Sequence, residues 1–161
     1  ILFKGVKNMA IQVGEKAPHF KLKNQHGKEV SAKDFAGKNI VLSFHPLAFT
    51  RVCTYQMQDL EKHKEDFDKL NSIALGISVD PVPAKHAWAK EIGVKETFLL
   101  SDFWPHGELA KAYGIFRETE GFSERAVIII DQEGIIRWVK VYPTSEKPPI
   151  EEIVEELKKI N

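Results

Sequence analysis

The chain is predicted to fold as an α/β domain, a three-layer sandwich with a mixed central sheet. Apolar strand patterns alternate with helical patterns, two strands joined by a glycine-containing turn follow, and an amphipathic helix comes last. A length of 161 residues fits one domain with one core. Hydrophobic residues make up 43% of the chain, which is enough to fill that core and too much for a disordered chain.

The strands follow from period-two and continuous apolar patterns. Residues 19–31 alternate apolar and polar on both sides of residues 24–27, which predicts a β-hairpin with a glycine in its turn. Residues 39–45 are short and mostly apolar, and residues 72–79 carry the β-branched side chains of a buried strand. Residues 97–100 are predicted to form a further short strand.

Helical patterns fill the intervals between these strands. Residues 51–70 form the longest one, and residues 83–92 begin with a proline suited to a first helical turn. Residues 107–113 are predicted to form a short helix that ends before a glycine. Residues 150–160 carry one aliphatic stripe, with glutamates early and lysines late, as the helix dipole favours.

The last third of the chain completes the predicted topology. Residues 125–130 and 135–141 flank a turn at residues 131–134, which predicts a second hairpin. A β-α-β half followed by a hairpin and a helix is the thioredoxin-like arrangement, to which the first hairpin is an N-terminal addition. We expect residues 1–10 to be an N-terminal extension and residues 11–161 to form the single domain.

Composition excludes several classes of function. Lys plus Arg is 23 and Asp plus Glu is 23, so the balanced charge indicates neither nucleic acid nor an anionic membrane as a partner. No apolar run approaches the roughly 20 residues of a membrane helix. A single cysteine argues against a disulfide scaffold and against a thiolate zinc site. It indicates a reducing compartment, and we expect a cytoplasmic protein.

That cysteine, Cys53, lies where a helix is predicted to start after a strand. Thr50 is a suitable N-cap, whose hydroxyl is expected to accept an N–H of the first turn. Cys53 then occupies the third helical position, among amide groups that have no helical partners. These amides, the helix dipole and the charge of Arg51 all favour the thiolate over the thiol.

The helix pattern leaves two interpretations of Cys53 open. Cys53 shares one stripe with Met57, Leu60, Phe67 and Leu70, and this stripe is expected to face the core. A free cysteine on such a stripe is commonly a small buried hydrophobe. From spacing alone, a reactive thiol shielded by its pocket and a purely structural thiol remain equally compatible with the sequence.

Four segments resemble one known family. Residues 46–53 read PLAFTRVC and match the PxxxTxxC motif of the peroxiredoxins. Residues 13–22, 101–115 and 124–138 resemble further segments of the same family in the same order. The similarity spans roughly residues 11–161 and is of the alkyl hydroperoxide reductase/thiol-specific antioxidant type. Since no second cysteine is present, the chain resembles a one-cysteine variant.

The resemblance implies roles for four residues. Cys53 would be the peroxidatic cysteine, and Thr50 would form hydrogen bonds around the sulfur and the bound peroxide. Pro46 would keep water from the sulfur, and Arg125 would stabilise the thiolate and orient the peroxide. Without the resemblance, Thr50 would be explained as a helix cap, Pro46 as a strand terminator and Arg125 as a solvated residue at a strand start. Gln56 stands where many relatives have a glutamate, so it can accept a hydrogen bond from the arginine without compensating its charge, and Arg125 is expected to be held less firmly.

The resemblance also implies an activity. The chain would be an antioxidant, thiol-dependent peroxidase that reduces hydrogen peroxide and organic hydroperoxides through a Cys53 sulfenic acid. An external thiol or thiol protein would regenerate it, with no metal, flavin or haem, and relatives are commonly homodimers or rings of dimers. A thiol redox sensor stays open as an alternative. A non-catalytic binding module is disfavoured by Pro46, Thr50 and Arg125, and a disulfide oxidoreductase by the absence of a C-x-x-C pair.

Overall fold

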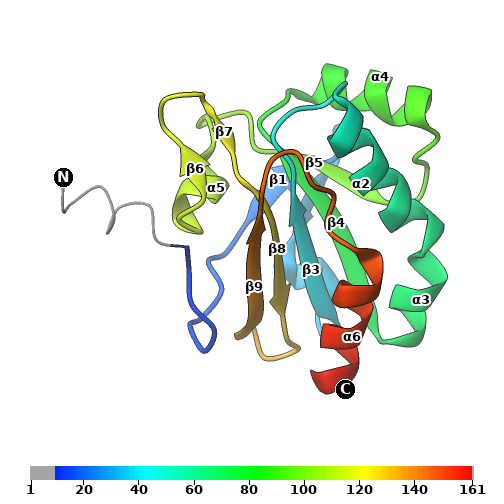
Figure 1. Cartoon of the computed structure of the whole chain (residues 1–161), viewed down its shortest axis with the longest axis vertical. Coiled ribbons are helices and arrows are strands. Elements are labelled where there is room, and N and C mark those ends of the chain that lie inside the picture. Colours follow the sequence, from blue (N-terminus) through cyan, green and yellow to red (C-terminus); the bar gives the residue numbers. More distant parts are fainter. Residues whose placement is uncertain (1–9, 161) are drawn as a thin grey trace.

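The computed structural model describes residues 10–160 and confirms the α/β class (Figure 1). Nine strands are described: β1 (Lys21–Lys23), β2 (Glu29–Ser31), β3 (Asn39–Phe44), β4 (Ser72–Ser78), β5 (Phe98–Ser101), β6 (Phe116–Arg117), β7 (Phe122–Ser123), β8 (Arg125–Ile130) and β9 (Ile136–Tyr142). The helices described are the 3₁₀-helix η1 (Ala32–Phe35) and the α-helices α2 (Arg51–Lys62), α3 (Lys64–Lys69), α4 (Val82–Ile92), α5 (Glu108–Ala112) and α6 (Ile150–Ile160).

The central sheet is mixed, as expected. Its strand order is β2-β1-β5-β4-β3-β8-β9. β3 and β4 run parallel, as do β4 and β5, and the crossovers between them contain helices. β8 runs antiparallel to β3, and β9 runs antiparallel to β8. The predicted first hairpin, β1 and β2, extends the sheet through the pairing of Lys23 with Ser101.

The sheet separates two apolar cores, which makes the domain three layers thick. β3 and β8 are buried at every position, as central strands covered on both faces should be. One core joins the sheet to α2, α3, α4 and α6, which lie together to the right of the sheet in Figure 1. The other core lies on the opposite face and includes α5. The three-layer, thioredoxin-like sandwich is therefore confirmed.

The predicted single helix over residues 51–70 is wrong, because the chain forms α2 and α3 with a break at His63. The His63 amide donates to the carbonyl of Asp59, and its ring Nδ1 lies 3.0 Å from the same oxygen. The His63 carbonyl then accepts from the amides of Asp66 and Phe67, which starts the next helix. The apolar stripe continues across this break, which is why the sequence pattern does not reveal it.

Other predicted elements agree with the structure to within one or two residues. The sequence did not indicate η1 or the small β6–β7 hairpin. Of the expected extension at residues 1–10, residues 1–9 lie outside the described residues, and Ala10 packs half-buried against the core. No helix within residues 10–160 is long and apolar enough to cross a membrane.

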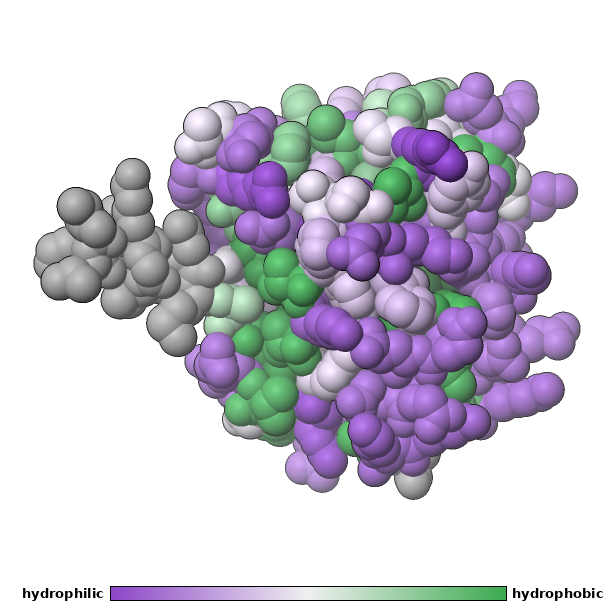
Figure 2. All heavy atoms as spheres, viewed as in Figure 1, coloured by the Kyte–Doolittle hydropathy of each residue, from purple (hydrophilic) through white to green (hydrophobic). Residues whose placement is uncertain are grey.

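Charged and polar side chains cover the helical side of the molecule (Figure 2). Apolar side chains gather left of centre in the same view, around β9 and the residues that lead into β1 (Figure 2). β9 is the last strand of the sheet, and residues 14–17 pair only with its start, around Ile136. Val141 of this strand is 44% exposed.

Helix α2, which carries Cys53, lies close to the sheet at Gly76 of β4. A Cβ atom placed on Gly76 would lie 2.3 Å from the Sδ atom of Met57 and 2.9 Å from a Leu99 methyl carbon. The absence of a side chain at Gly76 therefore makes room for the Met57 side chain of α2. This packing holds the helix, and with it the first turn that contains Cys53, against the end of β3.

Candidate active site

The topology brings Cys53 and Arg125 together from distant parts of the chain. β3 leads through residues 45–50 into α2, so Cys53 lies just beyond the carboxyl end of β3. β8 pairs antiparallel with β3, and its register sets Phe44 opposite Ala126. Arg125, the first residue of β8, therefore lies beside the last residue of β3. Antiparallel pairing thus places the start of β8 and the start of α2 together at the carboxyl end of β3.

The guanidinium of Arg125 contacts the sulfur directly. Arg125 Nη1 lies 3.3 Å from Cys53 Sγ, and the two residues are only 3% and 1% exposed. The same nitrogen donates to Gln56 Oε1 at 2.7 Å. On its other side, Nε and Nη2 donate to the carbonyl of Thr144 at 3.2 and 2.7 Å. A permanently charged group is therefore held from two sides with one donor aimed at the sulfur.

Gln56 connects this contact to the end of β3. Its Nε2 donates to Ser43 Oγ at 2.7 Å and to the carbonyl of Phe44 at 3.2 Å. With its Oε1 bound to Arg125, both ends of the buried amide are satisfied. The expectation that Gln56 accepts a hydrogen bond from the arginine is confirmed.

Thr50 occupies the predicted N-cap position, but its side chain does not form the expected cap bond. Its backbone is extended, with φ −114° and ψ 155°. The hydroxyl donates instead to the carbonyl of Leu47 at 2.7 Å, because the loop before α2 turns back and leaves that carbonyl within reach. The prediction that the Thr50 hydroxyl accepts an N–H of the first helical turn is therefore wrong. The oxygen of this exposed hydroxyl keeps lone pairs for another donor.

Pro46 is buried directly after the strand that leads to the site, between His45 and the loop that leads to Thr50. A groove of about 230 Å³ opens beside Thr50. Its lining includes Phe49, Thr54 and Trp88. A small molecule can therefore approach the start of α2 from the outside, although Cys53 itself is buried.

The sequence analysis missed one buried charged residue. Lys85 of α4 is completely buried, and its Nζ lies 2.9 Å from His45 Nε2 and 5.6 Å from the centre of the Trp88 ring. A signal was present, because Lys85 shares a helix face with Trp88, Ala89 and Ile92 at spacings of three, four and seven. A lysine on an apolar stripe indicates a specific buried partner.

Burial controls the protonation of this pair. It lowers the pKa of Lys85 from 10.5 to about 7, although electrostatic interactions with Asp80 and Cys53 act in the opposite direction. Burial, followed by the positive charge of Lys85, holds the pKa of His45 well below its ordinary value. A neutral His45 accepts from Lys85 through Nε2 and points Nδ1 at the carbonyl of Ser43, 3.5 Å away.

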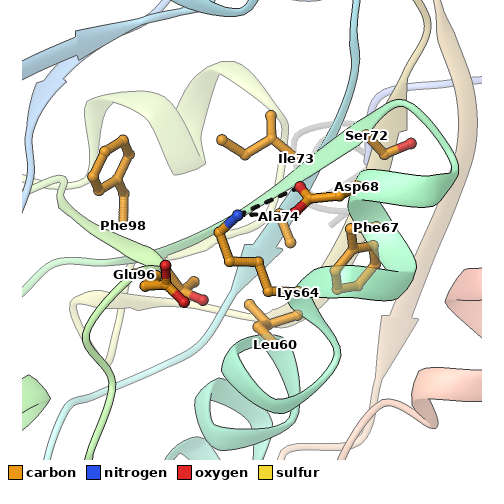
Figure 3. A pocket seen from close by; sticks show the side chains of 10 residues that line it. Leu60, Lys64, Phe67, Asp68, Ser72, Ile73, Ala74, Glu96 and Phe98 are labelled. Atoms are coloured by element: carbon orange, nitrogen blue, oxygen red, sulfur yellow. Dashed lines mark hydrogen bonds and ion pairs between the residues drawn. The ribbon is translucent and has the colours of Figure 1, made fainter.

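A second pocket lies at the opposite end of the sheet and does not extend the site (Figure 3). It lies between the end of α2, α3 and the start of β4, and its interior of about 20 Å³ has room for little more than a water molecule. Its ion pair, between Lys64 and Asp68 at 3.1 Å, joins two substantially exposed side chains one helical turn apart. Within residues 10–160, no three His, Cys, Asp or Glu residues are grouped to hold a metal ion.

Lys85 is expected to make the stability of the fold depend on pH. Its pKa is about 7 in the folded chain and about 10.4 in an unfolded one, so unfolding takes up a proton between these values. The free energy of unfolding should therefore rise with pH across this window. Urea unfolding in a Cys53→Ser background should show this rise, and Lys85→Met in the same background should show a smaller one. Equal slopes in the two proteins would contradict the assignment.

Comparison with known proteins identifies the family. Residues 13–139 match the AhpC/TSA family. Alkyl hydroperoxide reductase E of Mycobacterium tuberculosis is 41% identical over 138 residues, which cover 84% of this chain and 89% of that protein. A peroxiredoxin of Thermotoga maritima is 36% identical over 152 residues, or 91% and 70% of the two chains. The reduced 2-Cys peroxiredoxin of Plasmodium vivax superposes with a TM-score of 0.84 at 30% identity, covering 93% and 82% of the two chains. The chain therefore belongs to the AhpC/TSA family and is a thiol-dependent peroxidase of the peroxiredoxin type.

Proposed function

We propose that Cys53 reduces hydrogen peroxide and organic hydroperoxides, and that an external thiol then regenerates it. One observation carries this proposal: Arg125 Nη1 lies 3.3 Å from Cys53 Sγ in the first turn of α2. A sulfur beside a permanent positive charge and at a helix start is suited to react as the thiolate. The peroxide oxygen is attacked by the thiolate and not by the thiol.

In the first step, the Cys53 thiolate attacks the terminal peroxide oxygen. The S–O bond forms as the O–O bond breaks, and the electron pair of that bond moves to the leaving oxygen. The leaving oxygen takes up a proton and departs as water or an alcohol. Cys53 is oxidised by two electrons to the sulfenic acid, and the peroxide is reduced by the same two. Arg125 lowers the barrier because its donors bind the growing negative charge more strongly than the neutral peroxide.

Thr50 and Pro46 supply orientation and shielding in this proposal. The Thr50 hydrogen is engaged by the carbonyl of Leu47, so its oxygen is available as an acceptor. It would accept the peroxide O–H and thereby turn the terminal oxygen toward the sulfur. Buried Pro46 adds no donor or acceptor at its nitrogen, and would keep water away from the thiolate.

Regeneration requires a reductant from outside the chain, because the chain has one cysteine. A thiol attacks the sulfenic sulfur, which releases water and forms a mixed disulfide. A second thiol attacks that disulfide, restores Cys53 and leaves as part of an external disulfide. Since Cys53 is 1% exposed, the first turn of α2 would open to admit a thiol protein. A reducing compartment such as the cytoplasm would supply such reductants.

Replacing Cys53 by Ser should abolish peroxide consumption, because a hydroxyl at this site is not ionised at neutral pH. Peroxide loss with a thiol donor in excess is the measurement, and circular dichroism should show an unchanged fold. The wild-type protein should consume many equivalents of peroxide per chain. If it stops after about one equivalent with every donor tried, a redox sensor explains Cys53 better than an enzyme.

Thr50→Val should slow sulfenic acid formation about 10- to 100-fold, the cost of losing one hydrogen bond to a reacting group. Stopped-flow tryptophan fluorescence after mixing with hydrogen peroxide would follow this step. Thr119→Val is the matched control, because Thr119 is an exposed threonine in the turn between β6 and β7. Equal rates for wild-type protein and Thr50→Val would limit Thr50 to a structural role.

We also propose that the chain forms a homodimer or a ring of dimers. The exposed side chains of Leu47 and Phe49 follow β3, and those of Phe103 and Trp104 follow β5. Because β3, β4 and β5 run parallel, all four lie at the carboxyl ends of these strands. Trp104 is 81% exposed, and exposed apolar groups of this size commonly mark an interface. The part of β9 beyond Ile136, with the exposed Val141, is a second such surface. Light scattering should give at least twice the mass of one chain, and the mass of a single chain would contradict the proposal.

A further inference from the structure

The peroxide site contains a second buried cation whose partners are unusual. Lys85 forms no ion pair within residues 10–160, although it is completely buried. Its hydrogen-bond partner is the neutral imidazole of His45, and the Trp88 ring lies 5.6 Å away. A buried ammonium group is costly without an opposite charge. The group that offsets its charge must therefore lie beyond its first contacts.

Two series of contacts connect Lys85 to the site of the reactive sulfur, one through His45 and one through Trp88. His45 is joined to Pro46 and points its Nδ1 at the carbonyl of Ser43, whose hydroxyl accepts from Gln56. Gln56 in turn accepts from the Arg125 nitrogen that contacts Cys53. From the other direction, Trp88 Nε1 donates to the hydroxyl of Thr54, the residue after Cys53, at 3.3 Å. Lys85 is thus held on both sides by residues of the Cys53 site.

Two acidic residues act on Lys85, and a further basic residue acts on its partner His45. Asp80, which follows β4, and Cys53 of α2 both interact with it electrostatically and favour its protonated form. Asp80 Oδ2 already accepts from the amide of Ala48 and from the hydroxyl of Ser78, and Asp80 is only half-buried. Arg125 of β8 contributes a further positive charge near His45. Of the two acidic residues, Asp80 acts more strongly on Lys85, but Cys53 is the more deeply buried, so a negative sulfur would be a buried anion that helps to balance Lys85.

We propose that Lys85, held by His45, is a positioning residue of the peroxide site whose positive charge helps to keep Cys53 ionised at neutral pH. This inference rests on the proposed function of Cys53 as the residue that reacts with peroxide. The two charges stabilise each other, so each makes the ionised form of the other more favourable. Arg125 supplies a constant charge, whereas Lys85 supplies one that depends on pH.

Lys85→Gln tests the charge directly, because the amide of Gln can still donate to His45 Nε2 while the charge is lost. We expect the midpoint of the thiolate titration, followed by absorbance near 240 nm, to rise by about one pH unit, which is about a tenfold loss of thiolate on the acid side. Lys90→Gln is the matched control, since Lys90 is exposed on the same helix. Its titration should coincide with that of the wild-type protein. A Lys85→Gln midpoint equal to wild type would overturn the proposal.

The rate of reaction with hydrogen peroxide gives a readout that a purely structural role would not produce. Lys85→Gln should be slowed about tenfold near pH 6 and should approach the wild-type rate near pH 9, where the thiol is ionised without help. An equal slowing at every pH would indicate a packing defect and would overturn the charge role. The thiolate titration requires no peroxide, so a wild-type protein without peroxidase activity would refute the proposed function and leave the titration result to decide on Lys85.

A reciprocal measurement keeps the inference testable if Lys85→Gln does not fold. The Lys85 side chain can be titrated by ¹³C NMR of its ε-carbon in wild-type protein and in Cys53→Ser. Because coupling between two sites is mutual, removal of the thiolate should lower the Lys85 titration midpoint. Identical Lys85 titrations in the two proteins would show that the charges are independent and would refute the proposal.

Discussion

The contact between the Arg125 guanidinium and the Cys53 sulfur is the interaction on which the site depends. It exists because β8 starts where β3 ends, with Ala126 paired to Phe44. A shift of this register by one residue would turn Arg125 to the other face of the sheet and away from α2. The position of the charge is therefore determined by strand pairing far more than by the loop that carries Thr50.

The hydrogen-bond partners of the buried Arg125 guanidinium determine how much of its positive charge acts on the Cys53 sulfur. A carboxylate in contact with the guanidinium would neutralise much of its field at Cys53. Here the contacts are the amide oxygen of Gln56 and the backbone carbonyl of Thr144, both uncharged. They satisfy the donors without compensating the charge. With Gln56 in place of the glutamate that the family resemblance implies, Arg125 is hydrogen-bonded on both sides while its positive charge is left to the sulfur.

The sequence predicted best what local pattern determines. Hairpins, buried strands and α6 follow from period and turn residues, and Cys53 with its motif follows from a short stretch of chain. The break at His63 escaped prediction because the apolar stripe continues through it. The Thr50 hydroxyl was assigned a wrong partner, since its orientation depends on where the Leu47 carbonyl turns in three dimensions. Lys85 was missed because its partner, His45, is 40 residues away and only the packing of α4 on the sheet joins them.

Three basic side chains lie in this buried region, and they differ in how their charge depends on pH. Arg125 stays charged at every accessible pH. His45 is held neutral by burial and by its neighbours, so it serves as an acceptor. Only Lys85, with a pKa of about 7, changes its charge near neutral pH. Because the total charge that a buried site can carry is limited, ionisation of Cys53 and protonation of Lys85 favour each other.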